Sequence, residues 1–506
     1  MYLIQVNGSI LSSVNKGRND ILLPNRDYLK DAFQPLLSTS NGSCLFRKGI
    51  KHMKRSGMKI LIVMAMLSVS VGVSAASTSG TIGVNVLLSR DVDSAILKEL
   101  KGLGTVLNVI SEINGVTMRI KTYQLSTLQA LPYVVAAAPD AVRNGSPIDT
   151  VLATDFSGGH NTWDQDAINV TDARTTVRQV TFDGTGVYIA VLDTGLVDSW
   201  RQYFPQERIA EEYAISFGGG GGEVGTVSTQ KNKWEHDQNS HGTHVTSSIL
   251  GFQMGTSFIN GTAPKATIIP VKVLNQNGSG WSSVIAQGIL YVASLKKGPL
   301  ADFPVIINMS LGGSRLDPVE KAAINHAISV GIIIVASAGN EGEQGMGYPG
   351  AYAPVISVAA AGWIGEWKTP GSWWRSSDVP DPFDPLDFYI TDFSSREKDG
   401  QDLDVAAPGS WIVGPYQNNS GQISYYYLGG TSMSSPHVAG IVALMAQKLP
   451  SLYQSQVETI LETAAYPLPA GSRTIYYGGL PSQISWGDDA SGAGFITADQ
   501  ALSHTP

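Results

Sequence analysis

Five runs of apolar, mostly β-branched residues of strand length constrain most strongly what this chain of 506 residues can fold into. They alternate with segments of helical period, and they cover residues 187–192, 267–274, 305–311, 332–339 and 355–361. A continuous apolar run without polar alternation is typical of a strand that is covered on both faces. Helices between such strands make parallel crossover connections. We therefore expect an α/β fold with a doubly wound, mostly parallel sheet flanked by helices.

One helix of this pattern, over residues 317–330, is well delimited. Asp317 suits its N-cap, Pro318 its first position and Glu320 the acid of a capping box, while Gly331 ends it. In doubly wound sheets, functional sites gather at the carboxyl ends of the strands. Polar residues that directly follow the apolar runs are therefore the candidates for chemistry.

The first 76 residues differ from the rest of the chain in charge. They contain ten Lys and Arg against three Asp and Glu, although the whole chain has a formal net charge of −8. The remaining body is therefore strongly acidic and has no Lys/Arg cluster, which argues against nucleic acid as a partner.

A short apolar run lies inside this basic region. From Ile60 a mostly apolar run of about 16 residues follows a basic stretch and ends in Val73-Ser74-Ala75, which indicates a secretory signal peptide over residues 53–76. A membrane anchor is the alternative, but the run is shorter than the ~20 residues of a spanning helix, so we expect no stable anchor. Residues 1–52 are then an upstream extension outside the mature protein, which is expected to be secreted and extracellular. The chain has a single cysteine, Cys44, so intrachain disulfides and CxxC metal sites are excluded. Cys44 lies in the upstream extension.

A small segment without glycine-rich loops precedes the α/β region. Residues 77–148 combine alternating stretches at 81–88 and 116–120 with a helical stretch at 94–103. This mixture predicts a small α+β unit. Residues 149–506 are expected to form the main domain.

Three polar motifs in the main domain follow strands or begin helices. VLDTG places Asp193 directly after a buried strand, and NSHGTHV places His241 and His244 in the first turn of a helix. GTSMSSPHVAG places Ser432 shortly before Pro436, at a helix N-terminus. Each motif alone has an ordinary structural explanation, as a turn residue, a core histidine or an N-cap.

The histidines also leave a metal site open as an alternative. His236, Asp237, His241 and His244 lie close together in the sequence, but there is no HExxH and no obvious third ligand. A metal-dependent hydrolase is therefore a less favoured hypothesis. A non-catalytic binding module is the other alternative.

Together the three motifs supply the parts of a nucleophilic hydrolase. A serine hydroxyl needs a base that accepts its proton near neutral pH, and histidine fits. The imidazole needs a carboxylate that fixes its tautomer and stabilises the imidazolium. The chain order Asp193, His241, Ser432 differs from the orders of the chymotrypsin and α/β-hydrolase designs.

With these motifs the chain resembles the subtilisin-like serine proteases over about residues 160–505. VLDTG, NSHGTHV and GTSMSSPHVAG are similar to the family's Asp, His and Ser blocks, with Ser434 where many members have Ala. The resemblance implies that Asp193 is the orienting acid, His241 the general base and then acid, and Ser432 the nucleophile.

The resemblance also implies an oxyanion hole and a substrate groove. In ASAGNEG, Asn340 matches the family's oxyanion-hole asparagine, whose side-chain N–H would act with the backbone N–H of Ser432. NMSLGG resembles an edge that pairs with the main chain of extended peptides, so proteins or peptides are the implied substrates. The implied substrate-binding residues are Ser310, Leu311, Gly312, Ala338, Gly339, Gly347, Gly278 and Ser279.

Residues 77–148 are similar in position, size and their PYVVAAAPD ending to the inhibitory propeptides of the family. This likeness implies a zymogen whose propeptide is an intramolecular inhibitor, removed by self-cleavage between about Asp140 and Asp155. No cofactor is implied for catalysis, structural calcium is left open without assigned ligands, and a monomer is expected.

An insertion at about residues 363–389 departs from the family pattern. It contains Trp363, Trp367, Trp373 and Trp374. Such a long stretch with four tryptophans argues against disorder, so the rings either cover the core or form a rim for a substrate or partner. Acids recur in it at every third position as Asp378, Asp381, Asp384 and Asp387. They are candidate Ca²⁺ ligands, although acids in solvated loops are commoner.

Overall fold

The computed structural model describes residues 80–153, 161–173, 178–221, 226–368, 373–376, 378–417, 424–477 and 479–506. The expected upstream extension, the expected signal peptide and Cys44 lie outside these residues. Within the described part of the chain, no helix combines the length and the apolar character needed to cross a bilayer.

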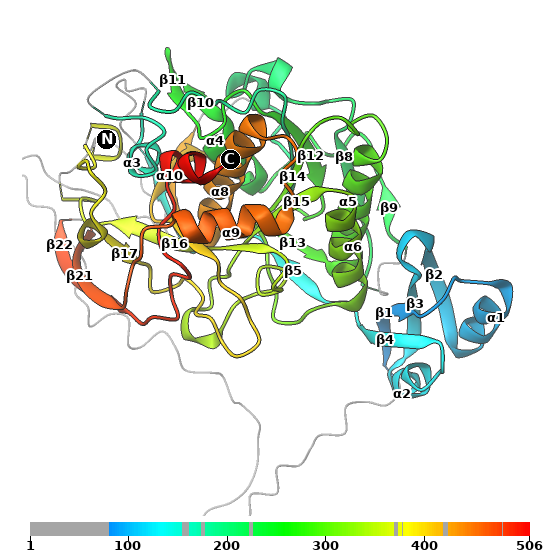
Figure 1. The fold of residues 1–506 in the computed structure, drawn as a ribbon. Coiled ribbons are helices and arrows are strands. Elements are labelled where there is room, and N and C mark those ends of the chain that lie inside the picture. The colour runs from blue at the N-terminus through cyan, green and yellow to red at the C-terminus, as the bar shows by residue number, and fades with distance from the viewer. Residues whose placement is uncertain are drawn as a thin grey trace, which may run out of the picture. The chain divides into compact units, whose positions relative to one another are not determined.

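A nine-stranded sheet forms the centre of the main domain (Figure 1). Its strands are β7 (Tyr188–Asp193), β8 (Ile215–Gly218), β9 (Ser228–Thr229), β12 (Thr267–Lys272), β14 (Val305–Met309), β15 (Ile332–Ser337), β16 (Ile356–Trp363), β17 (Phe388–Ile390) and β18 (Val405–Pro408). Their order is β17-β16-β15-β14-β7-β12-β8-β9, with β18 paired to β16. All pairs are parallel except β16–β17 and β8–β9. The five apolar runs therefore form neighbouring strands, as the sequence predicts.

Helices cover both faces of this sheet, which confirms the doubly wound α/β expectation. They include α4 (His241–Leu250), α5 (Ser282–Lys296), α6 (Pro318–Ser329), α8 (Thr431–Lys448), α9 (Gln454–Ala464) and α10 (Ala498–His504). On β7, Ile189 and Val191 belong to the core with α4 and α8, whereas Ala190 and Leu192 belong to the core with α5 and α6. All four side chains are buried, so neither face of the strand tolerates a polar residue.

Helix α6 begins where the sequence predicts. The Asp317 carboxylate accepts hydrogen bonds from the backbone N–H groups of Val319 and Glu320, and Pro318 lies in the first turn. The predicted capping-box role of Glu320 is wrong. Its carboxylate binds the guanidinium of Arg143, because a charge-assisted pair is stronger than a bond to a neutral N–H.

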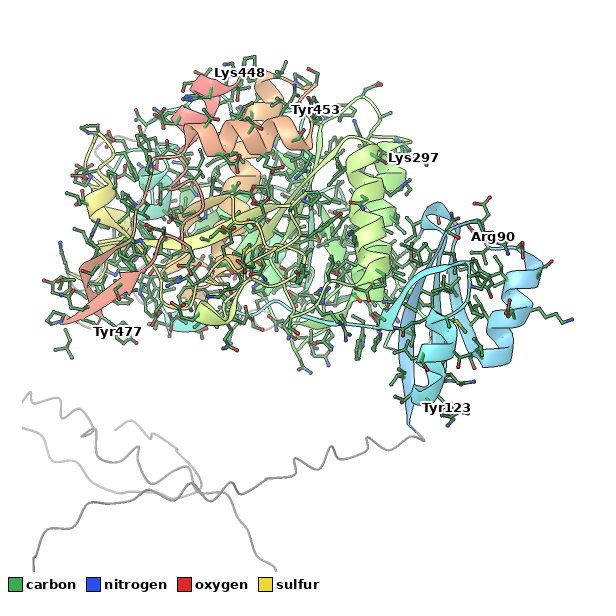
Figure 2. All side chains as sticks on the ribbon, turned by 60° about the horizontal axis from the view of Figure 1, so that its bottom comes forward. Arg90, Tyr123, Lys297, Lys448, Tyr453 and Tyr477 are labelled. Carbon is green, nitrogen blue, oxygen red and sulfur yellow. The ribbon has the colours of Figure 1, made fainter. Side chains whose placement is uncertain are left out.

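The segment predicted as an α+β unit is a four-stranded antiparallel sheet with two helices. Its elements are β1 (Thr81–Leu88), α1 (Ser94–Leu103), β2 (Gly104–Ile110), β3 (Gly115–Lys121), α2 (Leu125–Gln129) and β4 (Val134–Pro139), and the strand order is β2-β3-β1-β4. We call it the N-terminal unit. It lies beside α5 and α6 (Figure 1), and Figure 2 labels Arg90 and Tyr123 on it and Lys297 just after α5.

Buried polar side chains join the N-terminal unit to the starts of α5 and α6. Asn85 of β1 donates to the carboxylates of Asp140 and Asp317 at 2.9 Å each. Asp140 in turn accepts the backbone N–H of Ser283 in the first turn of α5 at 3.0 Å. An acid at a helix N-terminus is stabilised by the helix dipole. The N-terminal unit therefore provides part of the capping of the main domain.

The tryptophan-rich insertion packs into the main domain. Trp363, Trp373 and Trp374 are buried, and the ring centroids of Trp363 and Trp373 each lie 6.5 Å from that of Trp163. Beside them the buried Glu366 accepts a hydrogen bond from the hydroxyl of Tyr389 at 2.7 Å, and burial raises its pKa to about 8. The rings of these described residues cover the core, which favours the first of the two interpretations of the insertion.

The acids of the insertion form no cation site in the part that the structure describes. The only group of three or more close ligating side chains found there contains none of them. Asp384 instead accepts the backbone N–H of Leu386 at 2.8 Å, as an ordinary cap of a short helical turn.

Candidate active site

Asp193 and His241 meet at the carboxyl end of β7. Asp193 is the last residue of β7, His241 is the first of α4, and both side chains are fully buried. Nδ1 of His241 lies 2.8 and 2.9 Å from the two carboxylate oxygens of Asp193. The backbone N–H of Thr194 donates to Oδ1 of Asp193 at 2.6 Å. Since an ionised carboxylate only accepts hydrogen bonds, this geometry puts the imidazole proton on Nδ1 and leaves Nε2 as the basic atom.

A second buried acid, Asp237, holds the loop that leads into α4. It accepts the hydroxyl of Thr194 at 2.7 Å and the backbone N–H groups of Asn239 and Ser240 at 2.8 and 2.9 Å. Burial raises its pKa to about 6. These bonds fix the turn from which His241 projects.

The remaining histidines of the two helix motifs are structural. Nε2 of His244 lies 3.1 Å from the carbonyl oxygen of Ile412, and burial lowers its pKa to about 3, so the ring is neutral. Nε2 of His437 lies 2.9 Å from a carboxylate oxygen of Asp164. The one group of close ligating side chains in the described residues contains no histidine, so the histidine-based metal site is not formed there.

Ser432 lies in the first turn of α8 and is 2% exposed. Its hydroxyl donates to the carbonyl oxygen of Ser310 at 3.3 Å, and the Ser310 hydroxyl donates back to the carbonyl oxygen of Ser432 at 2.8 Å. Nε2 of His241 is buried and has no hydrogen-bond partner among the described residues. The structure therefore forms the acid–imidazole pair, while the serine hydroxyl is turned toward Ser310.

Asn340 follows β15 and is half-buried. Its Oδ1 accepts both the backbone N–H and the hydroxyl of Thr431 at 2.9 Å, which fixes the orientation of the side-chain amide. A Cβ added at Gly430 would lie 3.6 Å from Nδ2 of Asn340 and 3.7 Å from Cα of Pro147. Nδ2 of Asn340 and Cα of Pro147 therefore both lie close to Gly430, the residue that precedes Thr431 and Ser432.

The chain's own residues 142–152, which we call the crossing segment, run through this site. β5 (Val142–Asn144) pairs antiparallel with β13 (Ser279–Trp281). On its other side, Asn144 exchanges two backbone hydrogen bonds of 2.9 Å with Gly312. The segment is therefore the middle strand between two edges of the main domain.

Beyond Asn144 the crossing segment passes the catalytic candidates. The N–H of Gly145 donates to the carbonyl oxygen of Gly278 at 2.8 Å, and the N–H of Ile148 donates to that of Gly429 at 2.7 Å. A Cβ added at Gly145 would lie 3.3 Å from Cε1 of His241 and 2.7 Å from the carbonyl oxygen of Ser310. The backbone of Ser146 and Pro147 therefore lies between His241 and the start of α8.

The segment then leaves along the main domain. β6 (Asp149–Leu152) pairs antiparallel with β20 (Tyr425–Gly429), the strand that leads directly into α8. A cleft of about 880 Å³ borders residues 140–144, Ser146 and Ile148 and reaches Asn340 and Ser432. The crossing segment is thus extended both before and after it passes Ser432, in β5 and in β6.

The implied substrate-binding residues surround this strand in different ways. Gly312 and Gly339 line the cleft, and Gly278 and Ser279 pair with the crossing segment. Leu311 and Ala338 are buried behind the cleft wall, and Ser310 is bound to Ser432. A Cβ added at Gly347 would lie 3.6 Å from Cα of Gly312, so Gly347 supports the wall from behind.

Several residues of this site are not predicted from the sequence. One of them is Thr431, which orients Asn340. It belongs to the GTS motif, and its position next to Ser432 could have indicated a role in the site. Arg143 of the crossing segment forms a fully buried ion pair with Glu320. Nothing local marks that pair, because its members are 177 positions apart.

An acidic cluster away from the cleft is a candidate cation site. Carboxylate oxygens of Asp402, Asp404 and Glu458 lie within 4.8 Å of one another. Oδ2 of Asp404 accepts the backbone N–H and the hydroxyl of Ser357 at 2.7 Å, whereas its buried Oδ1 has no partner in the part of the chain that the structure describes. Burial raises the pKa of Asp404 to about 8 and that of Glu458 to about 7. An orphaned oxygen beside two further carboxylates fits a hard cation such as Ca²⁺.

Comparisons with known proteins find proteases among the relatives of this chain. The thermostable alkaline protease of Halalkalibacterium halodurans is 34% identical over 298 residues, which cover 59% of this chain and 66% of the relative. Subtilisin DY of Bacillus licheniformis is 33% identical over 301 residues, which cover 59% and 89%. Thermitase of Thermoactinomyces vulgaris is 33% identical over 266 residues, which cover 53% and 77%.

Solved structures have the same fold. Fervidolysin from Fervidobacterium pennivorans, described as a keratinolytic enzyme related to subtilisin, matches with a TM-score of 0.57 at 22% identity, over 85% of this chain and 62% of that one. The S41 psychrophilic protease matches with a TM-score of 0.50 at 29% identity, over 67% and 99%. The profile of the Subtilase family matches residues 184–493, the range that contains all the catalytic candidates. The chain therefore belongs to the subtilase family of serine endopeptidases.

Proposed function

We propose that this chain is a secreted serine endopeptidase that cleaves proteins or peptides through Asp193, His241 and Ser432 and is made as a self-processing zymogen. The observation that carries the proposal is the buried hydrogen bond from Nδ1 of His241 to Asp193, beside a strand of the chain's own residues. This arrangement supports a basic Nε2 that serves a serine at the start of α8.

In the proposed mechanism, Nε2 of His241 takes the proton of the Ser432 hydroxyl while Oγ attacks the substrate carbonyl carbon. Asp193 stabilises the imidazolium that forms. Nδ2 of Asn340 and the backbone N–H of Ser432 stabilise the oxyanion. His241 then donates its proton to the leaving amine, which departs and leaves an acyl-enzyme. Water releases the acyl group by the same steps with His241 as base.

The zymogen part of the proposal rests on the crossing segment. An extended strand that pairs on both sides and passes Ser432 excludes any other peptide from the groove. We propose that the inhibitory propeptide covers about residues 77–148 and the peptidase domain about residues 149–506, and that the cut between them lies near Ser146. Residues 53–76 would direct export of the chain, with residues 1–52 upstream, and the mature enzyme would be monomeric.

Active-site labelling tests this function. A fluorophosphonate should label the wild-type protein on the peptide that contains Ser432, because an activated serine attacks phosphorus as it attacks a carbonyl carbon. Brief exposure to EDTA should leave the labelling unchanged. The Ser434→Ala variant is the matched control and should be labelled equally, since this neighbouring serine has no role in the mechanism. Hydrolysis without a label on Ser432, or labelling on another serine, would reject the assignment.

We further propose that Asp402, Asp404 and Glu458 hold a structural calcium ion. In EDTA, burial of these acids favours their protonated forms in the folded protein, so stability should fall as pH rises from about 4 to about 8. Calcium should offset this loss and raise Tm by about 2–5 °C at pH 8 in differential scanning calorimetry. Asp404→Asn should lose the response, and the exposed Asp399→Asn should keep it. An equal response of both variants would place calcium elsewhere.

A further inference from the structure

Arg143 of the crossing segment forms a buried ion pair with Glu320. Nε of Arg143 donates to Oε1 of Glu320 at 3.1 Å, and Nη2 donates to Oε2. Nη2 also donates to the carbonyl oxygen of Arg315 at 3.0 Å. Both side chains of the pair are fully buried. Nη1 donates to the carbonyl oxygen of Val142, also at 3.0 Å. The contact is thus a two-point pairing of a guanidinium with a carboxylate, completed by two backbone acceptors.

The two partners of this pair belong to different parts of the molecule. Glu320 lies in α6 of the main domain, whereas Arg143 lies in β5, which is held by backbone hydrogen bonds to β13 and next to the bridge from Asn144 to Gly312. Backbone pairing accepts any extended peptide. A substrate that replaces the crossing segment therefore brings its own side chain to the position of Arg143.

The surroundings of Glu320 match arginine rather than a smaller cation. The carboxylate accepts two parallel N–H groups, which a guanidinium offers and an ammonium does not. A Cβ at Gly313 would lie 2.9 Å from Nη1 of Arg143, so the glycine leaves space for the planar head group. Once Arg143 leaves, the buried carboxylate of Glu320 has lost its ion-pair partner, which is unfavourable. A substrate whose guanidinium restores the ion pair therefore binds more tightly than one that does not.

We infer that Glu320 is a specificity-determining residue that selects substrates with arginine three residues before the residue whose carbonyl is attacked. The count takes Ser146, which lies between the backbone anchors at Gly145 and Ile148, as the residue whose carbonyl is attacked. Arg143 then stands three residues before it. The inference rests on the proposed endopeptidase function and names its substrate class, namely peptides with an arginine at this distance from the cleaved bond.

A series of peptide nitroanilides tests the inference on the self-matured wild-type enzyme. The series is succinyl-X-Ala-Ala-Phe-p-nitroanilide with arginine, lysine, citrulline, leucine or glutamate at X. The expected kcat/KM for arginine exceeds that for lysine about 10-fold and those for leucine and citrulline about 100-fold, with glutamate last. Citrulline is the sharpest comparison, because it keeps the shape of arginine and removes its charge.

Glu320→Gln should lower the ratio of kcat/KM between the arginine and leucine peptides to about 3 or less. Glu235→Gln is the matched control, because Glu235 pairs with Arg201 on the surface, and it should keep the wild-type ratio. If Glu320→Gln does not mature, the double variant Arg143→Gln, Glu320→Gln provides a neutral pair in the zymogen. Its mature form should show the same low ratio of kcat/KM between the arginine and leucine peptides.

The outcomes separate this inference from the proposed function. A protein that hydrolyses none of the peptides contradicts the endopeptidase function. A protein that hydrolyses all five with similar kcat/KM is an endopeptidase, and the inference is then wrong. An arginine preference that survives in Glu320→Gln also overturns the inference, because another group would then recognise the guanidinium.

Discussion

Replacing Ser432 by alanine is expected to lower kcat about 10⁶-fold, a magnitude that is carried over from a subtilisin. Alanine lacks the hydroxyl that gives its proton to His241 and forms the acyl-enzyme. Only the rate enhancement that comes from substrate binding and the oxyanion hole then remains. The measurement is hydrolysis of casein and of a peptide nitroanilide by the purified variant.

The same substitution should also stop maturation. If the crossing segment is cut by the Ser432 hydroxyl of its own chain, the variant accumulates as the form that still contains the propeptide, visible by mass and by N-terminal sequencing. Ser435→Ala is the control, because Ser435 lies in the same turn but donates to Asn308. It should mature and keep activity. Casein hydrolysis at the wild-type rate by the alanine variant would remove Ser432 from the mechanism, and equal sizes would assign the cut to another protease.

The sequence predicts the fold well because its signals are local. An apolar run with no polar alternation needs cover on both faces, and Ile189 and Ala190 point into different cores as that rule requires. The Asp317 cap and the neighbouring Pro318 also lie within one turn of each other, and α6 begins there. Interactions between residues that are close in the sequence can therefore be predicted from the sequence alone.

The site is predicted less completely because its side chains meet over long separations. Asn85 reaches Asp317 across 232 positions, and Arg143 reaches Glu320 across 177. The capping-box prediction for Glu320 failed for this reason, since the local pattern could not include a guanidinium from another unit. The motif letters also do not specify side-chain rotation, and the Ser432 hydroxyl donates to a carbonyl group here.

Asp193→Asn is expected to give the second-largest loss, about 10⁴-fold in kcat, the size of the same change in a serine protease with such a triad. The structure gives the reason. The backbone N–H of Thr194 donates to Oδ1 at 2.6 Å, so the amide oxygen of an asparagine takes that place. The amide nitrogen then replaces Oδ2, 2.9 Å from Nδ1 of His241. Two N–H groups cannot face each other, so the imidazole proton moves to Nε2.

An imidazole with its proton on Nε2 cannot accept one from Ser432, and the loss should therefore appear in kcat more than in KM. Asp237→Asn is the matched control, because Asp237 is an equally buried acid whose hydrogen bonds go to Thr194, Asn239 and Ser240. Its removal should lower Tm and change kcat less than about 10-fold. Equal losses of kcat in both variants would mean that the loop before α4 depends on each acid as a support, and Asp193 would then have no role of its own in setting the tautomer.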